Sequence, residues 1–277
     1  MTYGQLISQL ESELEVLGEE KESLSYVFKE LKSWTLTDLI LHFPREISVE
    51  DQSLLEEIFG QLAQHIPAQH ITGRAYFRDL TLKVSPDVLI PRPETGELVD
   101  LVLSQNESEN LRVLDIGTGS GAIALALKSA RPHWEVLASD ISQEALMIAR
   151  ENAELNKLDV QFLQSDVYEN IQGQFDIIIS NPPYIAFEDT AEVATNVYMH
   201  EPHSALFAEE NGLAIYRTIL SDATSFSNEN GKIYLEIGYK QGQDLQDLAK
   251  TYLPHKQCQV LKDLFGKERM VAIYGKS

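Results

Sequence analysis

The first seventy residues carry apolar side chains at helical spacing. Between residues 6 and 17, leucine and isoleucine recur every three or four positions, and residues 21–34 continue the pattern, which predicts two amphipathic helices. A third short helix is expected after Thr35. A fourth is expected after Ser48, because Ser48 and Asp51 have the spacing of a capping box. The pattern predicts a small helical bundle without strands.

The pattern changes to strand alternation after this bundle. Apolar and polar residues alternate between residues 71 and 89, as in the arms of a β-hairpin. Pro91 and Pro93 then stiffen the chain ahead of a helix that begins near residue 94. We therefore predict a helical domain over 1–72, a hairpin connector over 73–92 and a third region over 93–277.

Beyond residue 110, apolar strands and amphipathic helices alternate to the end of the chain. Alternation of this kind builds a parallel sheet with helices on both faces. The last two strands flank Gly266 and are expected to pair as a hairpin. The sequence thus predicts an α/β fold, a doubly wound sheet of seven strands with an antiparallel edge hairpin.

Composition places the chain among ordinary globular proteins. Of its 277 residues, 43% are hydrophobic and 23% are charged. No apolar run approaches the ~18 residues of a membrane span, and the N-terminus has no signal-peptide pattern, so we expect a cytoplasmic protein without membrane association. Cys258 is the single cysteine and cannot form an intrachain disulfide.

Net charge limits the class of partner. The formal net charge is -21 at pH 7. Nucleic-acid binders neutralise phosphates with lysine and arginine, so this charge argues against direct binding of DNA or RNA.

A glycine-rich turn ends the first strand of the third region. The segment at 115–121 reads DIGTGSG, in which three alternate glycines allow a sharp turn and leave room for a ligand beside the main chain. The following helix offers free backbone N–H groups to a carboxylate. The spacing differs from that of dinucleotide binders, so the turn alone also fits a purely structural role.

Acidic residues at the ends of the next two strands add to this turn. Asp140 ends one strand, where it can accept hydrogen bonds from both hydroxyls of a ribose; its alternative role is the N-cap of the helix near Ser142. Asp166 ends the next strand, where it can accept from an adenine amino group. Since strand ends of an open α/β sheet share one crevice, these positions predict an adenosine-containing cofactor.

The fourth strand ends in Asn181-Pro182-Pro183-Tyr184. The side-chain carbonyl of Asn181 and the backbone carbonyl of Pro182 can each accept one hydrogen from a planar NH2 group, and Tyr184 can stack on it. An amide nitrogen held in this way can direct its lone pair at an electrophilic methyl group. The turn therefore predicts methyl transfer to an amide or an aromatic amine.

The motifs together resemble the bacterial peptide chain release factor glutamine methyltransferase family. The resemblance covers essentially the full length and rests on QHITGRAYF, VLIPRPETGELV, VLDIGTGSGAIALAL, SNPPYI, HEPHSALFAEENGLAIYR and GKIYLEIGYKQG. It implies S-adenosylmethionine as cofactor and release factors as partners, with the glutamine of their Gly-Gly-Gln motif as the methyl acceptor. The resemblance assigns the methyltransferase domain to 93–277. Because residues 1–72 carry no catalytic constellation, we expect them to recognise the substrate, and we expect the enzyme to be a monomer.

The resemblance assigns the site residues by position. The cofactor's methionine part would be held by Gly117, Thr118, Gly119, Ser120 and Gly121, its ribose by Asp140, and its adenine would be bordered by Asp166 and Val167. Asn181, Pro182, Pro183 and Tyr184 would grip the glutamine amide, with Asn181 also beside the cofactor and Asn181, Pro182 and Tyr184 acting in catalysis. No metal site is implied, since His200 and His203 have no third ligand near them in the sequence.

The chain departs from the family pattern at two positions. Gly96 stands where the family usually has a glutamate, which bears on whether the segment 92–96 contributes to the cofactor pocket. Val167 stands where an aromatic residue is frequent, and Tyr168 is the candidate to replace it in stacking on adenine.

Two other substrates fit the same chemistry. An adenine amino group in DNA or RNA is also a planar NH2 group, although the acidic charge disfavours it. A glutamine of a ribosomal protein is chemically equivalent to that of a release factor. A module that only senses the cofactor is the remaining alternative, and an intact Asn181 disfavours it.

Overall fold

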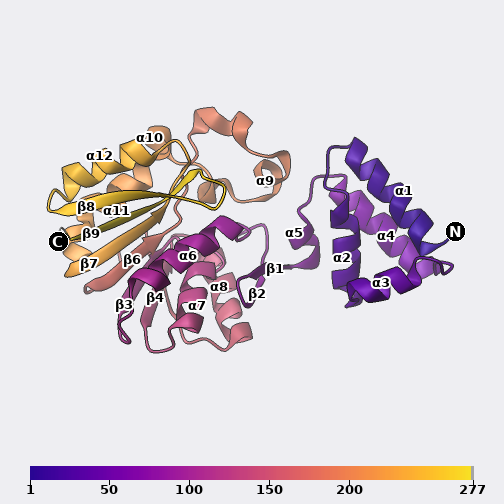
Figure 1. Cartoon of the computed structure of the whole chain (residues 1–277), viewed down its shortest axis with the longest axis horizontal. Helices are drawn as coiled ribbons and strands as arrows, with labels where there is room; N and C mark the ends of the chain where they lie inside the picture. Colours follow the sequence, from indigo (N-terminus) through magenta and orange to yellow (C-terminus); the bar gives the residue numbers. More distant parts are fainter. Residues whose placement is uncertain (276–277) are drawn as a thin grey trace. The chain divides into compact units, whose positions relative to one another are not determined.

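The computed structural model describes residues 1–275 and divides the chain into two compact units (Figure 1). The helical unit comprises residues 1–74 together with 193–201. The sheet unit comprises residues 75–192 and the chain from Pro202 onward. The three functional regions expected from the sequence, a recognition domain over 1–72, a connector over 73–92 and a methyltransferase domain over 93–277, stay a prediction.

The helical unit contains the four helices expected from the periodicity and two short ones that the pattern did not show. Its helices are α1 (Tyr3–Val16), α2 (Glu22–Lys32), α3 (Leu36–His42), α4 (Val49–Leu62), α5 (Ala68–Thr72) and α9 (Thr195–His200). With 5 and 6 residues, α5 and α9 are too short to display an amphipathic repeat.

The capping box expected at the start of α4 forms only in part. Ser48 Oγ accepts a hydrogen bond from the backbone N–H of Asp51 at 3.1 Å. The Asp51 carboxylate pairs with Lys32 Nζ at 2.7 Å and accepts from the hydroxyl of Tyr3, and the reciprocal bond to the Ser48 backbone N–H that would complete the box is not formed. The carboxylate joins α4 to α1 and α2, beside a core that includes Leu14, Leu24, Phe28, Leu55 and Ile58.

The sheet unit alternates strands and helices along the chain. Its strands are β1 (Arg74–Phe77), which begins at the unit boundary, β2 (Leu80–Lys83), β3 (Arg112–Ile116), β4 (Glu135–Asp140), β5 (Gln161–Gln164), β6 (Phe175–Ser180), β7 (Ser227–Glu236), β8 (Lys256–Lys262) and β9 (Glu268–Gly275). Its helices are α6 (Pro93–Gln105), α7 (Ala122–Ala130), α8 (Gln143–Asn156), α10 (Glu209–Gly212), α11 (Ala214–Phe226) and α12 (Gly242–Tyr252), with 3-10 turns η1 (Phe187–Glu192) and η2 (His203–Ala205).

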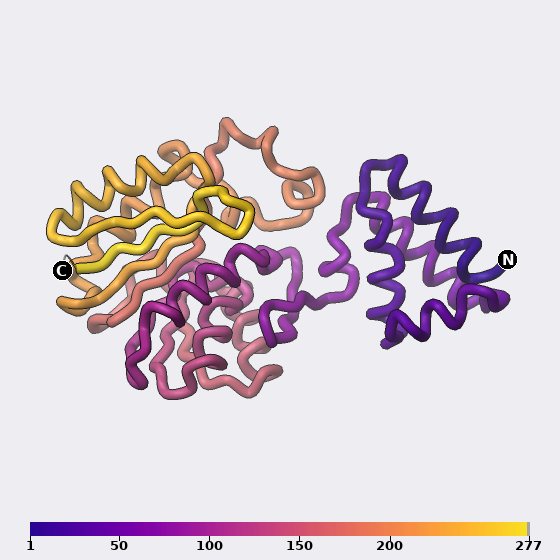
Figure 2. Tube along the Cα trace, in the orientation of Figure 1, coloured from indigo at the N-terminus to yellow at the C-terminus, as the bar shows by residue number. Residues whose placement is uncertain are grey.

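Seven of these strands form one sheet in the order β5-β4-β3-β6-β7-β9-β8. The strands from β5 to β7 are parallel, whereas β9 pairs antiparallel with both β7 and β8. β1 and β2 form a separate two-stranded sheet. The doubly wound sheet with an antiparallel edge hairpin is therefore confirmed, and its strands can be followed side by side in Figure 2.

Alternate residues of the central strands face two different cores. On β6, Ile177 and Ile179 pack with residues of α6 and α7, whereas Ile178 packs with residues of α11 and α12. Successive side chains of a strand point to opposite faces, so a strand covered on both faces must be apolar throughout. This explains the uninterrupted run Ile177–Ile179 in the sequence.

Neither a membrane span nor a metal cluster is found in the described part of the chain. Within residues 1–275, no helix is long and apolar enough to cross a bilayer. In the same residues, no three histidine, cysteine or acidic side chains are grouped to hold a metal ion. His200 Nε2 lies 3.0 Å from the carbonyl of Gln64, and His203 packs edge-on against Phe207.

Candidate functional site

The glycine turn follows β3, an inner strand of the sheet, at the point where the strand order reverses. After β3 the chain forms β4 and β5 on one side and then returns to β6 on the other. Ile116, the last residue of β3, pairs with Ser139 of β4 and Ser180 of β6. The segments that follow these strands therefore emerge at one edge, where open α/β sheets bind ligands.

A cavity of about 480 Å³ opens at this edge. Its size and apolar lining are typical of a small-molecule site. Among the predicted site residues, its wall includes Gly117, Thr118, Gly119, Ser120, Asp140, Asp166, Val167, Asn181, Pro182 and Pro183. Gly121 and Tyr184 do not line it.

The glycines of the turn have different local roles. Gly117 and Gly119 have positive φ values of 70° and 54°, and a Cβ at either position would meet no atom within 4 Å. The space that a side chain would fill at these positions is empty, so a ligand can lie directly against the main chain. Gly121 has φ 85°, and a Cβ there would lie 3.2 Å from Leu125 and 3.3 Å from Ala149, so this glycine allows close packing.

Asp140 holds the glycine turn from the neighbouring strand. Its Oδ2 accepts from the N–H of Gly119 at 2.8 Å, and its Oδ1 accepts from the N–H of Ser142 at 2.9 Å. Ser142, rather than Asp140, is the N-cap of α8. A carboxylate has about four acceptor positions, so these backbone donors do not exhaust its capacity to accept from a ligand hydroxyl. Burial raises the pKa of Asp140, although the backbone donors oppose this shift.

Asp115 is a buried acid that the sequence analysis did not single out. It is the penultimate residue of β3, just ahead of the glycine turn, and its Oδ2 accepts from Thr118 Oγ1 at 2.6 Å. Complete burial raises the pKa of Asp115 to about 7. Its Oδ1 is the one carboxylate oxygen within residues 1–275 that is buried without a hydrogen-bond partner. The signal in the sequence was an acid inside the apolar strand LRVLDI.

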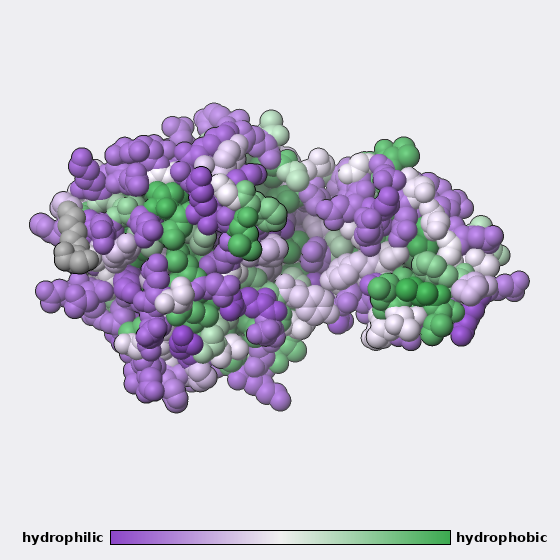
Figure 3. Space-filling view, viewed as in Figure 1, coloured by the Kyte–Doolittle hydropathy of each residue, from purple (hydrophilic) through white to green (hydrophobic). Residues whose placement is uncertain are grey.

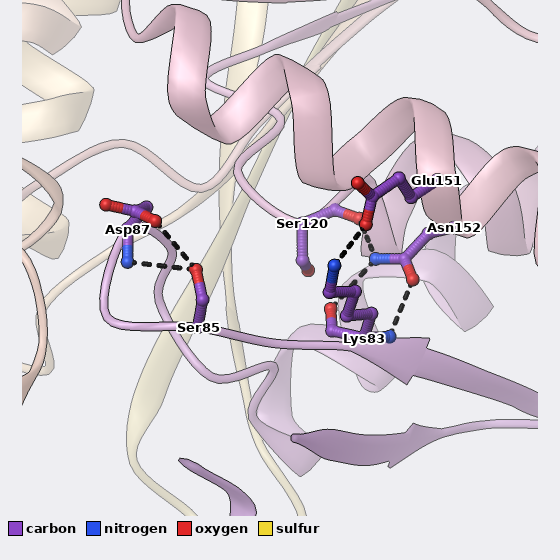
Figure 4. A network of polar contacts seen from close by, with 6 residues as sticks. All are labelled: Lys83, Ser85, Asp87, Ser120, Glu151 and Asn152. Carbon is purple, nitrogen blue, oxygen red and sulfur yellow. Dashed lines mark hydrogen bonds and ion pairs between the residues drawn. The ribbon is translucent and has the colours of Figure 1, made fainter.

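Asn152 connects the hairpin to the glycine turn, a role that the sequence did not indicate. Its Oδ1 accepts from the N–H of Lys83 at 2.6 Å, while its Nδ2 donates to the carbonyls of Lys83 at 3.0 Å and Ser120 at 2.8 Å (Figure 4). One fully buried side chain thus fixes β2 against α8 and the turn. The segment after β2 contributes Asp87 and Val88 to the cavity wall.

Replacing Asn152 with alanine is expected to lower both stability and cofactor affinity. The change leaves three backbone groups without their partner, and each unsatisfied group costs about 1 to 3 kcal/mol. We expect the melting temperature to fall by several degrees and the dissociation constant of S-adenosylmethionine to rise about fivefold, by differential scanning and titration calorimetry.

The matched control for Asn152→Ala is Asn156→Ala on the same helix. Asn156 Nδ2 donates to the carbonyls of Thr81 and Asn152, at 2.9 Å each, and does not touch the glycine turn. This change should lower stability alone. Equal loss of cofactor affinity in the two variants would contradict a specific link between Asn152 and the turn.

The end of β5 places Val167, not Tyr168, on the cavity wall. Val167 has φ 45°, a value that β-branched residues rarely adopt, and Ser165 Oγ donates to its carbonyl at 3.2 Å. Tyr168 is buried on the other side, stacked on Phe226 at 4.3 Å, with its hydroxyl bonded to the carbonyl of Ile219. Tyr168 therefore cannot replace the missing aromatic residue beside the adenine, which is a correction to the sequence interpretation.

The start of α6 contributes Thr95 rather than Gly96 to the cavity. Thr95 lies on the wall, whereas a Cβ at Gly96 would face Arg78 and Phe77 at 3.9 Å. The position where the family usually has glutamate therefore points toward the hairpin in this chain.

The turn after β6 is held at both ends. Asn181 Nδ2 donates to Thr95 Oγ1 at 3.2 Å, and the carbonyl of Tyr184 accepts from Gln241 Nε2 at 3.0 Å. Gly212 packs against the same carbonyl so closely that a Cβ there would lie 2.0 Å from the oxygen. These contacts fix the backbone of the turn independently of a ligand.

The ring of Tyr184 is half-buried and packs against the core that Ile178 forms with residues of α11 and α12. Burial raises the pKa of Tyr184 to about 12, so its hydroxyl stays neutral at ordinary pH. The structure thus brings Asn181, Pro182 and Pro183 to the cavity. The Tyr184 ring lies beside Gly238 instead, where a Cβ added to Gly238 would lie 3.4 Å from the ring.

Two sequence families match the chain. The family described as PrmC N-terminal domain matches residues 5–73, and the one described as Methyltransferase small domain matches residues 97–212. Among solved structures, a ribosomal protein L11 methylase from Lactobacillus delbrueckii subsp. bulgaricus aligns with a TM-score of 0.51 and 25% identity, covering 67% of this chain and 81% of its own. This likeness supports the methyltransferase fold.

Full-length relatives carry the same name. A release factor glutamine methyltransferase from Streptococcus pneumoniae is 54% identical over 99% of this chain and 98% of its own length. Its counterpart from Lactococcus lactis subsp. lactis is 49% identical over 92% of this chain and 94% of its own. With such identity across both the helical and the sheet regions, the chain belongs to the release factor glutamine methyltransferase family.

Proposed function

We propose that this protein transfers a methyl group from S-adenosylmethionine to the side-chain amide nitrogen of the glutamine in the Gly-Gly-Gln motif of peptide chain release factors. The observation that carries the proposal is the placement of Asn181 and Pro182 on the wall of the same cavity as the glycine turn and Asp140. A cofactor seated on that turn would lie beside the acceptors that hold the amide.

The cofactor site is assigned to the turn and to the neighbouring strand ends. The open space at Gly117 and Gly119 and the remaining acceptor capacity of Asp140 fit an adenosyl group with a charged methionine tail. We assign the tail to the turn 117–121, the ribose hydroxyls to Asp140 and the edge of the adenine to Asp166 and Val167. When bound, S-adenosylmethionine supplies an electrophilic methyl group on a sulfonium centre.

The protein's part in the transfer is to hold the acceptor nitrogen. Asn181 Oδ1 and the carbonyl of Pro182 each accept one amide hydrogen, which favours pyramidal geometry at nitrogen and directs its lone pair at the methyl carbon. The new N–C bond forms as the C–S bond breaks, its electron pair stays on sulfur, and the nitrogen loses one proton to solvent. Fixed dipoles stabilise the charge that develops on the amide.

Acidic charge favours a protein acceptor over nucleic acid. Asp and Glu number 43 against 22 Lys and Arg. Adenine in DNA or RNA presents the same planar NH2 group, but its phosphates would be repelled. We therefore propose release factors as partners, with the enzyme acting as a monomer in the cytoplasm.

The helical unit is proposed to recognise the release factor. It contains no catalytic constellation, and apolar side chains gather on one face of it (Figure 3). On α3 the exposed side chains include Leu36, Ile40 and Leu41, which are 60%, 53% and 58% exposed. Exposed apolar groups of this kind are typical of protein contacts.

Replacing Leu36, Ile40 and Leu41 together with serine is expected to raise KM for whole release factor about tenfold, because apolar contact area is lost. The affinity for S-adenosylmethionine should not change. Steady-state kinetics with whole release factor measure the effect, and Leu155→Ser, at an exposed position on α8, is the control. Unchanged KM in the triple variant would contradict recognition through α3.

The experiment that tests the function is methyl transfer from labelled S-adenosylmethionine to purified release factor, followed by mass mapping of the labelled peptide. We expect label on the glutamine of the Gly-Gly-Gln motif and none on a release factor in which that glutamine is replaced by glutamate. DNA, RNA and ribosomal proteins are assayed in parallel. Label on adenine or only on a ribosomal protein would refute the proposal.

A further inference from the structure

Asn181 can serve as an acceptor only if its side-chain amide has one of its two orientations. With Oδ1 toward the cavity, the residue accepts from an incoming NH2 group. With the amide turned over, its own NH2 would face the NH2 of the substrate, and neither group could accept. The proposed function therefore requires something in the protein to fix this orientation.

Thr95 and Glu236 provide a chain of hydrogen bonds behind Asn181. Thr95 Oγ1 donates to Glu236 Oε2 at 2.7 Å, and Asn181 Nδ2 donates to Thr95 Oγ1 at 3.2 Å. Glu236 is 2% exposed and Thr95 is 4% exposed, so water does not compete at the inner end of this chain. Within the described residues 1–275, Asn181 Oδ1 makes no hydrogen bond to the protein, which leaves it for a ligand.

The direction of these bonds follows from proton count. A threonine hydroxyl has a single proton, and an ionised carboxylate only accepts. Once the Thr95 proton is given to Glu236, Thr95 can only accept from Asn181. Asn181 must then present Nδ2 to Thr95, and Oδ1 to the cavity.

From this geometry we infer that Glu236, acting through Thr95, is the positioning residue that fixes the amide of Asn181 with its oxygen toward the substrate. The inference rests on the proposed function, because only an amide acceptor requires this orientation. Glu236 lies at the end of β7 and Thr95 in the first turn of α6, so two elements far from the Asn-Pro-Pro-Tyr turn in sequence set its chemistry.

Protonation of Glu236 would release this constraint, since a carboxylic acid can donate to Thr95 and allow Thr95 to donate to Asn181. Burial raises the pKa of Glu236 to about 7. The charged and titratable groups around it are Arg92, Glu94, Tyr184, Tyr216 and Arg269, and the two arginines favour the ionised form. Transfer should therefore be fastest above this pKa and slow as the pH falls through it.

The first test compares Thr95→Val with Thr95→Ser. Valine has the shape of threonine without the hydroxyl, so the acceptor for Asn181 is lost, whereas serine retains it. We expect kcat to fall at least about tenfold in Thr95→Val, with KM for release factor changed much less, and Thr95→Ser to restore most of the rate. Equal kcat values for the two variants would overturn the inference.

The second test follows the side-chain amide of Asn181 by NMR and does not depend on activity. Its N–H signals, assigned by their absence in Asn181→Ala, should shift with pH with a midpoint near the Glu236 pKa of about 7, and the shift should vanish in Glu236→Gln. The acidic limb of the pH–kcat profile should vanish in the same variant. If these signals do not titrate in the parent enzyme, the inference that Glu236 orients Asn181 through Thr95 is overturned.

The two proposals fail in distinguishable ways. If the parent enzyme methylates no glutamine, the proposed function is refuted, whereas the titration of the Asn181 amide still reports whether Glu236 orients it. If the parent methylates the glutamine but Thr95→Val keeps the rate of Thr95→Ser, only the inference about Glu236 is refuted.

Discussion

Asn181→Ala is expected to slow methyl transfer to release factor about 100- to 1000-fold, the usual cost of losing one preorganised electrostatic contact at a reacting centre. The change removes an acceptor that holds the substrate amide, whereas the turn 117–121 and Asp140 are untouched. Cofactor affinity should therefore change little. Single-turnover kinetics and titration calorimetry on the same preparations separate the two effects.

Asn110→Ala is the control for Asn181→Ala. Asn110 is exposed and precedes β3, at the opposite edge of the sheet from the cavity. Its replacement should leave transfer unchanged. An Asn181→Ala enzyme that transfers at the parent rate would rule out the clamp on the glutamine amide.

Asp140→Ala is expected to weaken S-adenosylmethionine binding about 10- to 100-fold. The ribose would lose two charge-assisted hydrogen bonds, each worth about 1.5 to 3 kcal/mol, and water recovers part of this loss. The N–H groups of Gly119 and Ser142 also lose their acceptor, so the glycine turn is less well held. Titration calorimetry measures the dissociation constant directly.

Asp159→Ala, an exposed carboxylate between α8 and β5, controls for the loss of negative charge in Asp140→Ala. Its cofactor affinity should match that of the parent. A folded Asp140→Ala protein with an unchanged dissociation constant would show that the ribose binds elsewhere.

Local pattern in the sequence was enough to predict the seven-stranded sheet and the four longer helices of the helical unit. Alternation of apolar strands and amphipathic helices predicted the doubly wound sheet, and the ends of β3, β4, β5 and β6 carried the glycine turn, Asp140, Asp166 and Asn181. These positions could be grouped from the sequence because the carboxyl ends of neighbouring parallel strands meet at one edge. Periodicity is a property of a few consecutive residues, so it can be seen in the sequence.

Tertiary structure alone decided which side chains support the site. Glu236 reaches Thr95 across 141 positions in the chain, Asn152 reaches Lys83 across 69, and neither pairing has a local signature. The direction in which Tyr168 points also depended on Phe226, which lies on α11. A hydrogen bond or a ring contact between distant segments depends on how the elements pack together, and that packing brings Glu236 and Thr95 behind Asn181.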